Sequence, residues 1–217
     1  MFYLYSKIGS CIFSGDILKP ETYNNFIAPE SIDWIITDPP YVRNSLNVFK
    51  GLIELAEYSL KEEGGMIVMT GQKYIPEIFK LMKSNSVHYC WMLAYLMLDE
   101  NTKKSVNKDI HAENYWKPLF LFRKDCSKQK KFKDIIRCPK DNNDKKYHPW
   151  GQNIKAFEEI IEMMTDKDDF ILDPFMGGGT TLLAALNKKR KFIGFDIDQN
   201  YVKIVNERII RKLNFNR

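Results

Sequence analysis

Two short motifs hold the residues of this chain that are best suited to chemistry. The first, residues 37–41, reads Thr-Asp-Pro-Pro-Tyr, so the Asp38 carboxylate and a rigid backbone precede an aromatic ring. Carboxylate and carbonyl oxygens accept hydrogen bonds from an amino group, and an aromatic ring provides a surface on which a base can stack. The second, residues 173–180, is rich in glycine, which lets the backbone approach a nucleoside-type cofactor closely. Together the motifs indicate group transfer to a nucleobase.

Each motif follows a short apolar run that predicts a buried strand. Candidate strands lie near residues 11–14, 32–37, 65–70, 87–97, 116–122, 169–173 and 191–195. Helices are predicted near 49–61, 153–165 and 199–212, and we expect Gly64 and Gly65 to stop the first of them. This alternation predicts an α/β fold with a mainly parallel seven-stranded sheet flanked by helices. Both motifs then lie at the carboxyl edge of the sheet, where open α/β folds bind ligands.

The two motifs, taken in this order, resemble those of the DNA amino-methyltransferases that use S-adenosylmethionine. In the permuted β-type members of that family, the catalytic motif precedes the cofactor motif. The resemblance extends from about Cys11 to about Arg208 and is weak near residues 99–147. It implies a single Rossmann-like methyltransferase domain over residues 1–217, with a circularly permuted motif order.

The activity implied by this resemblance is transfer of a methyl group from S-adenosylmethionine to the N6 amino group of adenine in DNA. Asp38, rather than serine, before Pro-Pro-Tyr favours adenine within the resembled family. Three alternatives stay open: transfer to N4 of cytosine, transfer to RNA, and a DNA-binding protein of the same fold that lacks activity. The intact Asp38 and Asp196 argue against the inactive alternative.

The catalytic residues expected from the first motif are Asp38, Pro39, Pro40 and Tyr41. An exocyclic amino group is a poor nucleophile because its lone pair is delocalised into the ring. Asp38 and the carbonyl of Pro39 can accept hydrogen bonds from its two N–H groups and thereby direct the lone pair at the methyl group. Positioning and preorganised acceptors then supply most of the catalysis. The proline pair fixes the backbone, and Tyr41 stacks on a base that has been flipped out of the duplex.

The cofactor residues expected from the second motif are Asp173, Pro174, Phe175, Gly177, Gly179 and Thr180. The N–H groups at the start of the helix that follows can bind the carboxylate of a methionine moiety. Asp196 ends the next predicted strand, about twenty residues beyond the glycines, where an acid can accept hydrogen bonds from both ribose hydroxyls. We favour Asp196 over Asp198, which is better placed to cap a helix.

Two further segments resemble cofactor segments of the family. Asp16 and Ile17 follow a predicted strand and are expected at the adenine moiety of the cofactor. Residues 147–153 resemble a His-Pro-x-x-Lys-Pro segment, which makes His148 a further candidate cofactor residue. Gln152 and Asn153, however, occupy the positions at which lysine and proline are usual. The contacts to the methionine end of the cofactor therefore stay open.

The positive charge of the chain is concentrated in one stretch. The net charge is +5, and residues 99–147 contain 14 lysines and arginines against 8 acidic residues, leaving 19 against 20 elsewhere. We interpret segments 99–114 and 123–147 as mobile basic loops that face double-stranded DNA and recognise the target. Their densest cluster comprises Lys128, Lys130, Lys131 and Lys133. A solvated loop is the alternative interpretation.

Composition and cysteine spacing argue against several other classes of protein. The 217 residues are 44% hydrophobic and 28% charged, which is ordinary for a globular domain. No apolar run is as long as a membrane span and the first residues do not resemble a signal peptide, so we expect a cytoplasmic protein. The four cysteines are too scattered for a zinc site, and we expect thiols and no metal. A homodimer and a cognate restriction endonuclease are further candidate partners.

Overall fold

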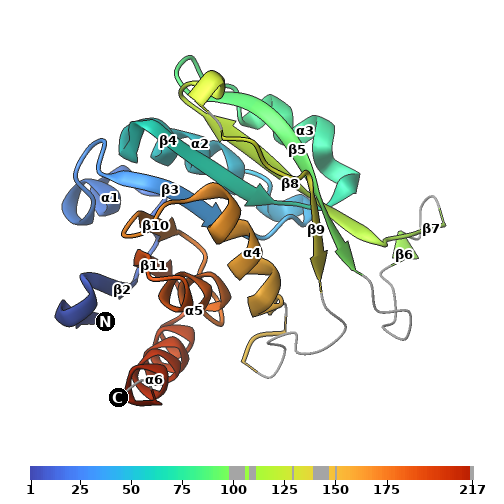
Figure 1. Ribbon diagram of the computed structural model, residues 1–217. Coiled ribbons are helices and arrows are strands. Elements are labelled where there is room, and N and C mark those ends of the chain that lie inside the picture. Colours follow the sequence, from blue (N-terminus) through green and yellow to red (C-terminus); the bar gives the residue numbers. More distant parts are fainter. Residues whose placement is uncertain (98–105, 108–110, 129, 139–146, 150, 216–217) are drawn as a thin grey trace.

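The computed structural model describes residues 1–97, 106–107, 111–128, 130–138, 147–149 and 151–215, and it contains a nine-stranded sheet (Figure 1). From one edge to the other, the strand order is β1-β2-β11-β10-β3-β4-β8-β5-β9. The strands of this sheet are β1 (Phe2–Tyr5), β2 (Ser10–Ser14), β3 (Ile32–Thr37), β4 (Leu60–Met69), β5 (His88–Met97), β8 (Trp116–Arg123), β9 (Ile135–Cys138), β10 (Phe170–Asp173) and β11 (Lys191–Asp196). A separate hairpin pairs β6 (Val106–Asn107) with β7 (Ala112–Glu113).

Five neighbouring strands of the sheet, β2, β11, β10, β3 and β4, run parallel to one another. β8 is antiparallel to both of its neighbours, and β1 is antiparallel to β2. The expected α/β fold with a mainly parallel sheet is therefore confirmed. The expected number of seven strands is wrong, because β1 and β9 add an edge strand at each side of the described sheet. Each of the two has four residues of alternating exposure, which is a weak sequence signal.

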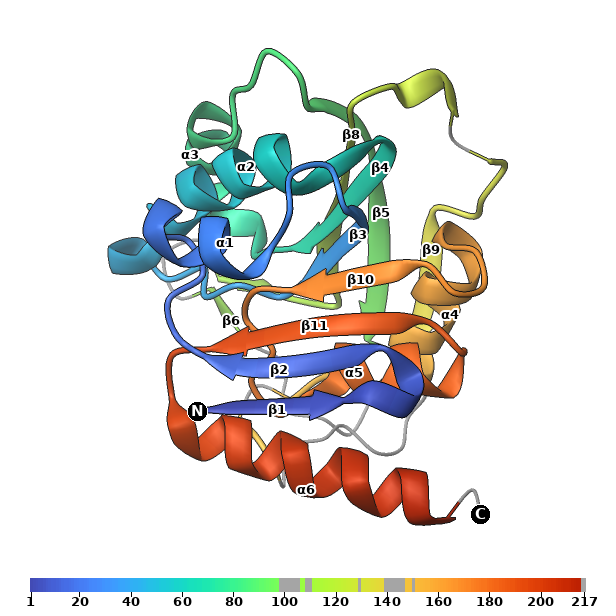
Figure 2. The same cartoon turned by 90° about the vertical axis from the view of Figure 1, so that its left-hand side faces the viewer.

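Helices cover both faces of the sheet (Figures 1 and 2). One group comprises α1 (Pro20–Phe26), α2 (Val48–Ser59) and α3 (Ile75–Leu81), which pack on a core that includes Ile35 and Val68. The other comprises α4 (Ile154–Met164), α5 (Thr180–Asn187) and α6 (Gln199–Phe215), which pack on a core that includes Ile36 and Met69. Successive residues of a strand point to opposite faces, so the buried strands contribute to both cores. With both faces covered, the ends of the strands are the places where a site can open.

The helix that begins at Val48 does not end at the expected glycines. α2 ends at Ser59, and Gly64 and Gly65 lie inside β4. A Cβ atom at Gly65 would lie 2.5 Å from the ring of Trp34 on the neighbouring β3, so glycine leaves the room that this ring needs. The expected glycine stop is therefore wrong, because these residues serve the packing of two strands.

The two segments interpreted as basic loops contain regular structure. Within residues 99–114 the described part includes the β6–β7 hairpin, and within 123–147 it includes the short helix η4 (Cys126–Lys128) and β9. β9 pairs in parallel with β5 and buries Ile136 and Cys138, so the loop interpretation is wrong for this strand, as it is for the hairpin. Three further lysines of the segment 99–114, Lys103, Lys104 and Lys108, lie outside the described residues.

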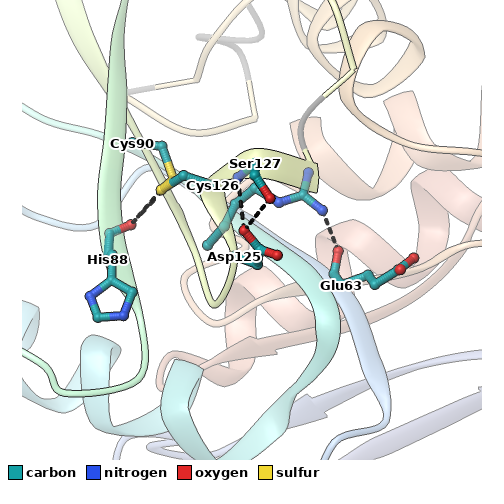
Figure 3. Close-up of a disulfide and its surroundings, with 7 residues drawn as sticks. Glu63, His88, Cys90, Asp125, Cys126 and Ser127 are labelled. Carbon is teal, nitrogen blue, oxygen red and sulfur yellow. Dashed lines mark hydrogen bonds between the residues drawn. A yellow bond between two sulfur atoms is a disulfide. The ribbon is translucent and has the colours of Figure 1, made fainter.

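A disulfide joins Cys90 of β5 to Cys126 of η4 (Figure 3). The antiparallel pairing of β5 with β8 places His88 opposite Arg123 and brings the turn after β8 next to the start of β5. The Cα atoms of the two cysteines are 5.5 Å apart, within the usual range for a disulfide. The expectation of thiols is therefore wrong for this pair, whose separation of 36 residues carries no spacing signal.

Candidate functional site

Four strands bring the candidate residues to one edge of the sheet. β2, β11, β10 and β3 are consecutive neighbours and end in the same direction (Figure 2). At the carboxyl ends, Asp173 lies beside Gly194, and Asp196 lies beside Ser14. The N–H of Gly15 donates to the carbonyl oxygen of Asp196 at 3.0 Å. The expected position of both motifs at the carboxyl edge is thus confirmed.

Asp173 connects the two motifs. Its Oδ1 accepts a hydrogen bond from the Thr37 hydroxyl at 2.7 Å and another from the Phe175 N–H at 3.1 Å. The residue is 2% exposed, and this burial raises the pKa of Asp173 to about 6. Because these bonds cross between β3 and the loop after β10, the carboxylate holds the two motif loops against each other.

The glycine loop turns sharply between β10 and α5. Gly177 and Gly179 have φ angles of +46° and +82°, in the left-handed region that favours glycine. The N–H of Gly177 donates to Asp196 Oδ2 at 2.9 Å, and Asp196 Oδ1 accepts from the N–H of Asp198 at 2.8 Å. Burial raises the pKa of Asp196. Asp196 therefore orders the loop, and its oxygens retain lone pairs for further donors.

Gly179 is expected to tolerate a side chain least among the residues of this loop. A Cβ atom there would lie 2.8 Å from Val205 of α6, in addition to the strain of the positive φ. Replacing Gly179 with alanine should lower the free energy of unfolding by about 1–3 kcal/mol, the usual cost of a strained backbone residue. Urea unfolding followed by circular dichroism measures this loss. The control is Gly15→Ala, whose Cβ would meet Thr22 at an ordinary 3.9 Å; equal losses in both variants would contradict the prediction.

The expected helix cap Asp198 and the expected cofactor residues Asp16 and Ile17 lie in other segments. Asp198 caps α6, as expected, since its Oδ1 accepts a hydrogen bond from the N–H of Asn200 at 2.8 Å. Asp16 is half-buried, and its Oδ1 accepts from the N–H of Leu18 at 3.2 Å. Ile17 is 2% exposed and packs in the core, so its backbone rather than its side chain can face a ligand.

His148 lies against the glycine loop. A Cβ atom at Gly177 would be 3.4 Å from the imidazole ring. Within the loop itself, Pro174 and Thr180 are buried, whereas Phe175 is half-buried. The structure thus gathers around one loop residues that are far apart in the sequence.

The carboxylate of Asp38 has one bonded and one unbonded oxygen. Its Oδ2 accepts a hydrogen bond from Gln152 Nε2 at 2.6 Å. Its Oδ1 is buried and has no hydrogen-bond partner among the residues that the structure describes. Burial raises the pKa of Asp38, while Lys117, Gln152 and His148 act in the opposite direction. A buried acceptor without a donor costs free energy, so this oxygen is a candidate partner for an N–H group of a ligand.

Gly71 and Lys117 lie beside the catalytic motif, although no sequence motif includes them. A Cβ atom at Gly71 would lie 2.8 Å from the Tyr41 ring, so the missing side chain makes room for this ring. Lys117 of β8 places its Nζ 5.8 Å from the centroid of the same ring. Of the two prolines before Tyr41, Pro39 is buried and Pro40 is exposed. The sequence did offer one indication that Lys117 has a role: it is the only charged residue in the otherwise apolar run 116–122, where a lysine is unusual.

Lys128 and Lys130 lie at the opposite edge of the sheet from Asp38. They line a hollow together with Asp33, which stands near the start of β3. Lys130 also forms an ion pair with Asp166, with an N–O distance of 2.5 Å. This placement favours the alternative interpretation, a solvated loop, for these two lysines.

The chemistry of the residues around the glycine loop fits S-adenosylmethionine. The Asp196 carboxylate suits ribose hydroxyls, and the glycines allow close approach of the backbone at the start of α5. In the described ranges, no group of three His, Cys, Asp or Glu side chains could hold a metal ion. The helices in those ranges include none that is long and apolar enough to cross a bilayer.

Comparison with known proteins identifies the class that this fold and site define. The model of a DNA methylase family, the N6/N4 methyltransferases, matches residues 32–207. This match covers most of the chain, so the chain belongs to the N6/N4 DNA methylase family. Members of this family use S-adenosylmethionine as methyl donor. The resemblance seen in the two sequence motifs is thereby confirmed.

Similar proteins include several bacterial Type II methyltransferases. M.HpaI of Haemophilus parainfluenzae is 27% identical over 222 residues, which cover 85% of this chain and 70% of that protein. M2.DpnII of Streptococcus pneumoniae is 28% identical and covers 94% of this chain and 91% of that protein. Among solved structures, the M1.HpyAVI–SAM complex has a TM-score of 0.71 at 24% identity, covering 91% of this chain and 98% of that chain. The cytosine-N4-specific PvuII DNA methyltransferase shares the fold with a TM-score of 0.74 at 19% identity, covering 91% and 85%.

Proposed function

We propose that this protein transfers a methyl group from S-adenosylmethionine to the N6 amino group of adenine in double-stranded DNA. The observation that carries this proposal is the buried Asp38 Oδ1, an acceptor at the carboxyl edge of the sheet that lacks a donor among the described residues. The target amino group supplies that donor. The Asp-Pro-Pro-Tyr form of the motif supports adenine over cytosine as the target.

In the proposed reaction, two acceptors prepare the amine. Asp38 accepts a hydrogen bond from one N–H of the target, and the main-chain carbonyl of Pro39 accepts one from the other. Gln152 holds the second oxygen of Asp38 and thereby sets the orientation of the carboxylate. When bound, S-adenosylmethionine supplies an electrophilic methyl group on its sulfonium. The directed lone pair would form the N–C bond as the C–S bonding pair returns to sulfur, which becomes a neutral thioether. The methylated nitrogen would then lose one proton to water, so no covalent enzyme intermediate is needed.

Tyr41 offers the stacking surface for the base. A base inside a duplex cannot reach Asp38, so it is flipped out at a cost of about a few kcal/mol. Stacking on an aromatic ring returns about 1–3 kcal/mol per base. The rings of Pro39 and Pro40 fix their φ angles. This restriction holds the acceptor carbonyl of Pro39 in one orientation relative to the backbone of Tyr41.

The cofactor lies, in this proposal, along the carboxyl ends of β2, β10 and β11. Asp196 accepts hydrogen bonds from the ribose hydroxyls, and Asp16 binds the adenine amino group beside the backbone of Ile17. Phe175 faces the sulfonium, where a cation–π contact is worth roughly 0.5–2 kcal/mol. The remaining residues shape the pocket for the methionine moiety: Asp173, Pro174, Gly177, Gly179, Thr180 and His148.

Detection of modified bases tests the proposed function. DNA from a host that expresses the chain is sequenced for methylated bases, beside DNA from a host that expresses Asp38→Ala. N6-methyladenine in a defined sequence context, found with the wild-type chain alone, supports the proposal. N4-methylcytosine would assign the reaction to cytosine, methylated RNA alone would move it to RNA, and no modified base would support the inactive alternative.

Arg43 and Lys50 are exposed just after the catalytic motif, at the same edge of the sheet. Replacing both with glutamine should weaken DNA binding and flatten its salt dependence, because log K changes by about 0.9 per neutralised phosphate per decade of salt. DNA titrations across a salt series measure this slope. The matched control replaces Lys128 and Lys130 with glutamine and should leave the slope unchanged. If only the control variant had a flatter salt dependence, Lys128 and Lys130 rather than Arg43 and Lys50 would contact the DNA phosphates.

The other expected partners stay predictions. The Type II names of the similar proteins support a cognate restriction endonuclease that acts on the same DNA sequence. The homodimer and the cytoplasmic location rest on the sequence interpretation alone. Light scattering of the purified protein measures its oligomeric state directly.

A further inference from the structure

Lys117 is a half-buried lysine at the catalytic edge of the sheet. It stands near the start of β8, which runs antiparallel to β4 and β5, so the first residues of β8 lie at the carboxyl edge. Leu119, two residues later, is buried in the core cluster that also contains Ile36 of β3. Because residues two apart in a strand share a face, Lys117 lies on the same face of the sheet.

The strand register places Gly71 opposite Lys117. Met69 pairs with Leu119, and the N–H of Thr70 donates to the Pro118 carbonyl at 3.0 Å, which extends this pairing beyond the end of β4. Gly71 has no side chain to fill the space between β3 and β8. An ammonium group on β8 can therefore reach across the end of β4 to the catalytic loop.

Tyr41 occupies the space above Gly71. A Cβ atom at Gly71 would lie only 2.8 Å from the Tyr41 ring, so a side chain there would collide with the ring. Lys117 Nζ lies 5.8 Å from the centroid of this ring. Burial lowers the pKa of Lys117, but the charge of Asp38, followed by the interaction with Tyr41, outweighs burial and raises it. One ammonium group thus interacts with two residues of the catalytic motif.

The charges around Asp38 come from several elements. Burial raises the pKa of Asp38, and Lys117 opposes it most strongly, followed by the hydrogen bond from Gln152 and the charge of His148. The other titratable groups that interact with Asp38 are Tyr41 in its own loop, Asp173 at the end of β10 and Tyr95 on β5. None of these three is a cation, so Lys117 is the principal positive charge acting on Asp38 within the described residues.

Gln152 shows why this charge matters in this chain. It donates to Asp38 Oδ2 at 2.6 Å, so the side chain at position 152 reaches the catalytic carboxylate. In the family that the motifs resemble, lysine is usual at this position, whereas glutamine is neutral. In this chain the positive charge that acts most strongly on Asp38 belongs to Lys117 of β8.

We propose that Lys117 is a positioning residue of the methyl transfer, whose ammonium group balances the Asp38 carboxylate and holds the Tyr41 ring in place for the target base. This inference rests on the proposed function for the identity of the reaction. The position of Lys117 Nζ by the Tyr41 ring and its electrostatic effect on Asp38 are properties of the folded protein, so both can be measured in the absence of substrate.

The first test is the titration of Asp38 in the purified protein. Carboxyl ¹³C NMR with labelled aspartate, compared with Asp38→Asn, identifies the Asp38 signal. An opposite charge within reach lowers a carboxyl pKa by about 1–3 units, so Lys117→Met should raise the titration midpoint of Asp38 by about one unit or more. Lys117→Arg keeps the charge and should leave the midpoint near the wild-type value.

The second test is the pH dependence of kcat/KM, which reports the ionisation of groups in the free enzyme. Because the reaction requires ionised Asp38, the acid limb of the profile should move to higher pH in Lys117→Met by the same amount as the midpoint. Lys124→Met is the matched control, since Lys124 has a side chain only 9% exposed and pairs with Glu30 away from the site. This control should leave the acid limb in place.

An unchanged Asp38 midpoint in folded Lys117→Met would overturn the inference, as would an equal shift in Lys117→Arg. A uniform loss of activity with an unmoved acid limb would show a merely structural lysine and would also overturn it. Should Lys117→Met fail to fold, Lys117→Gln replaces it, with the same shift expected. If Lys117→Met shifts the Asp38 midpoint but the wild-type protein methylates no nucleic acid, the proposed function is rejected and the effect of Lys117 on Asp38 stands.

Discussion

Asp38→Ala should reduce methyl transfer by about 10²–10³ in kcat, the usual effect of removing one preorganised hydrogen-bonding group from a transition state. The lost group is the buried Oδ1, which has no donor among the described residues and is the proposed acceptor for the target amine. Single-turnover assays with labelled S-adenosylmethionine and DNA measure this step directly. Cofactor affinity should stay near its wild-type value, because Asp38 acts on the base and not on the sulfonium ligand.

The control for Asp38 is another aspartate near the same strand. Asp33→Asn alters a carboxylate that pairs with Lys61 at the opposite end of β3, so turnover should not change. Asp38→Asn keeps the shape of the side chain and one acceptor oxygen, and it should retain more activity than Asp38→Ala. Near-wild-type turnover of Asp38→Ala would show that another group accepts the amine N–H.

Asp196→Ala should weaken the binding of S-adenosylmethionine by roughly tenfold or more. Hydrogen bonds to charged groups contribute about 1.5–3 kcal/mol, and about 1.4 kcal/mol corresponds to tenfold in affinity. Asp196 also accepts the N–H of Gly177, so the variant loosens the glycine loop in addition to losing the ribose contact. Isothermal titration calorimetry measures the change.

Asp198→Ala separates the ribose contact from the effects of a disturbed helix. Asp198 caps α6, and removing such a cap costs about 0.5–2 kcal/mol of stability. Its loss should lower the melting temperature while leaving cofactor affinity close to that of the wild type. If Asp198→Ala weakens binding and Asp196→Ala does not, the ribose contact belongs to Asp198.

The central sheet and its motif-bearing ends could be predicted from the sequence because the signals are local. Ile35 and Ile36 lie in a buried apolar run that a carboxylate follows, and the run before Asp173 has the same form. Each of these strands is buried on both faces, so its apolar content is continuous and easily recognised. The order of the two motifs along the chain then indicated the family.

The misses involve signals that depend on distant partners. Gly65 looks like a helix stop until Trp34 is placed against it, and the disulfide of Cys90 with Cys126 depends on the pairing of β5 with β8. Lys117 follows the same rule, because its neighbours Asp38 and Tyr41 lie more than seventy residues away in the chain. The edge strands β1 and β9 were missed because each is short and half-exposed.

The strand order has a consequence for the biosynthesis of this protein. β2 and β3 follow each other in the chain, yet β10 and β11 lie between them in the sheet. While the chain is being synthesised, β1–β2 and β3-β4-β8-β5-β9 can form only as two separate partial sheets, each with an unpaired edge. Such edges readily pair with other chains, so the nascent protein is vulnerable to aggregation until residues 170–196 leave the ribosome. Those last strands close the sheet and form the glycine loop at the same step, so we expect a chain truncated before β10 to form two partial sheets with unpaired edges and to aggregate.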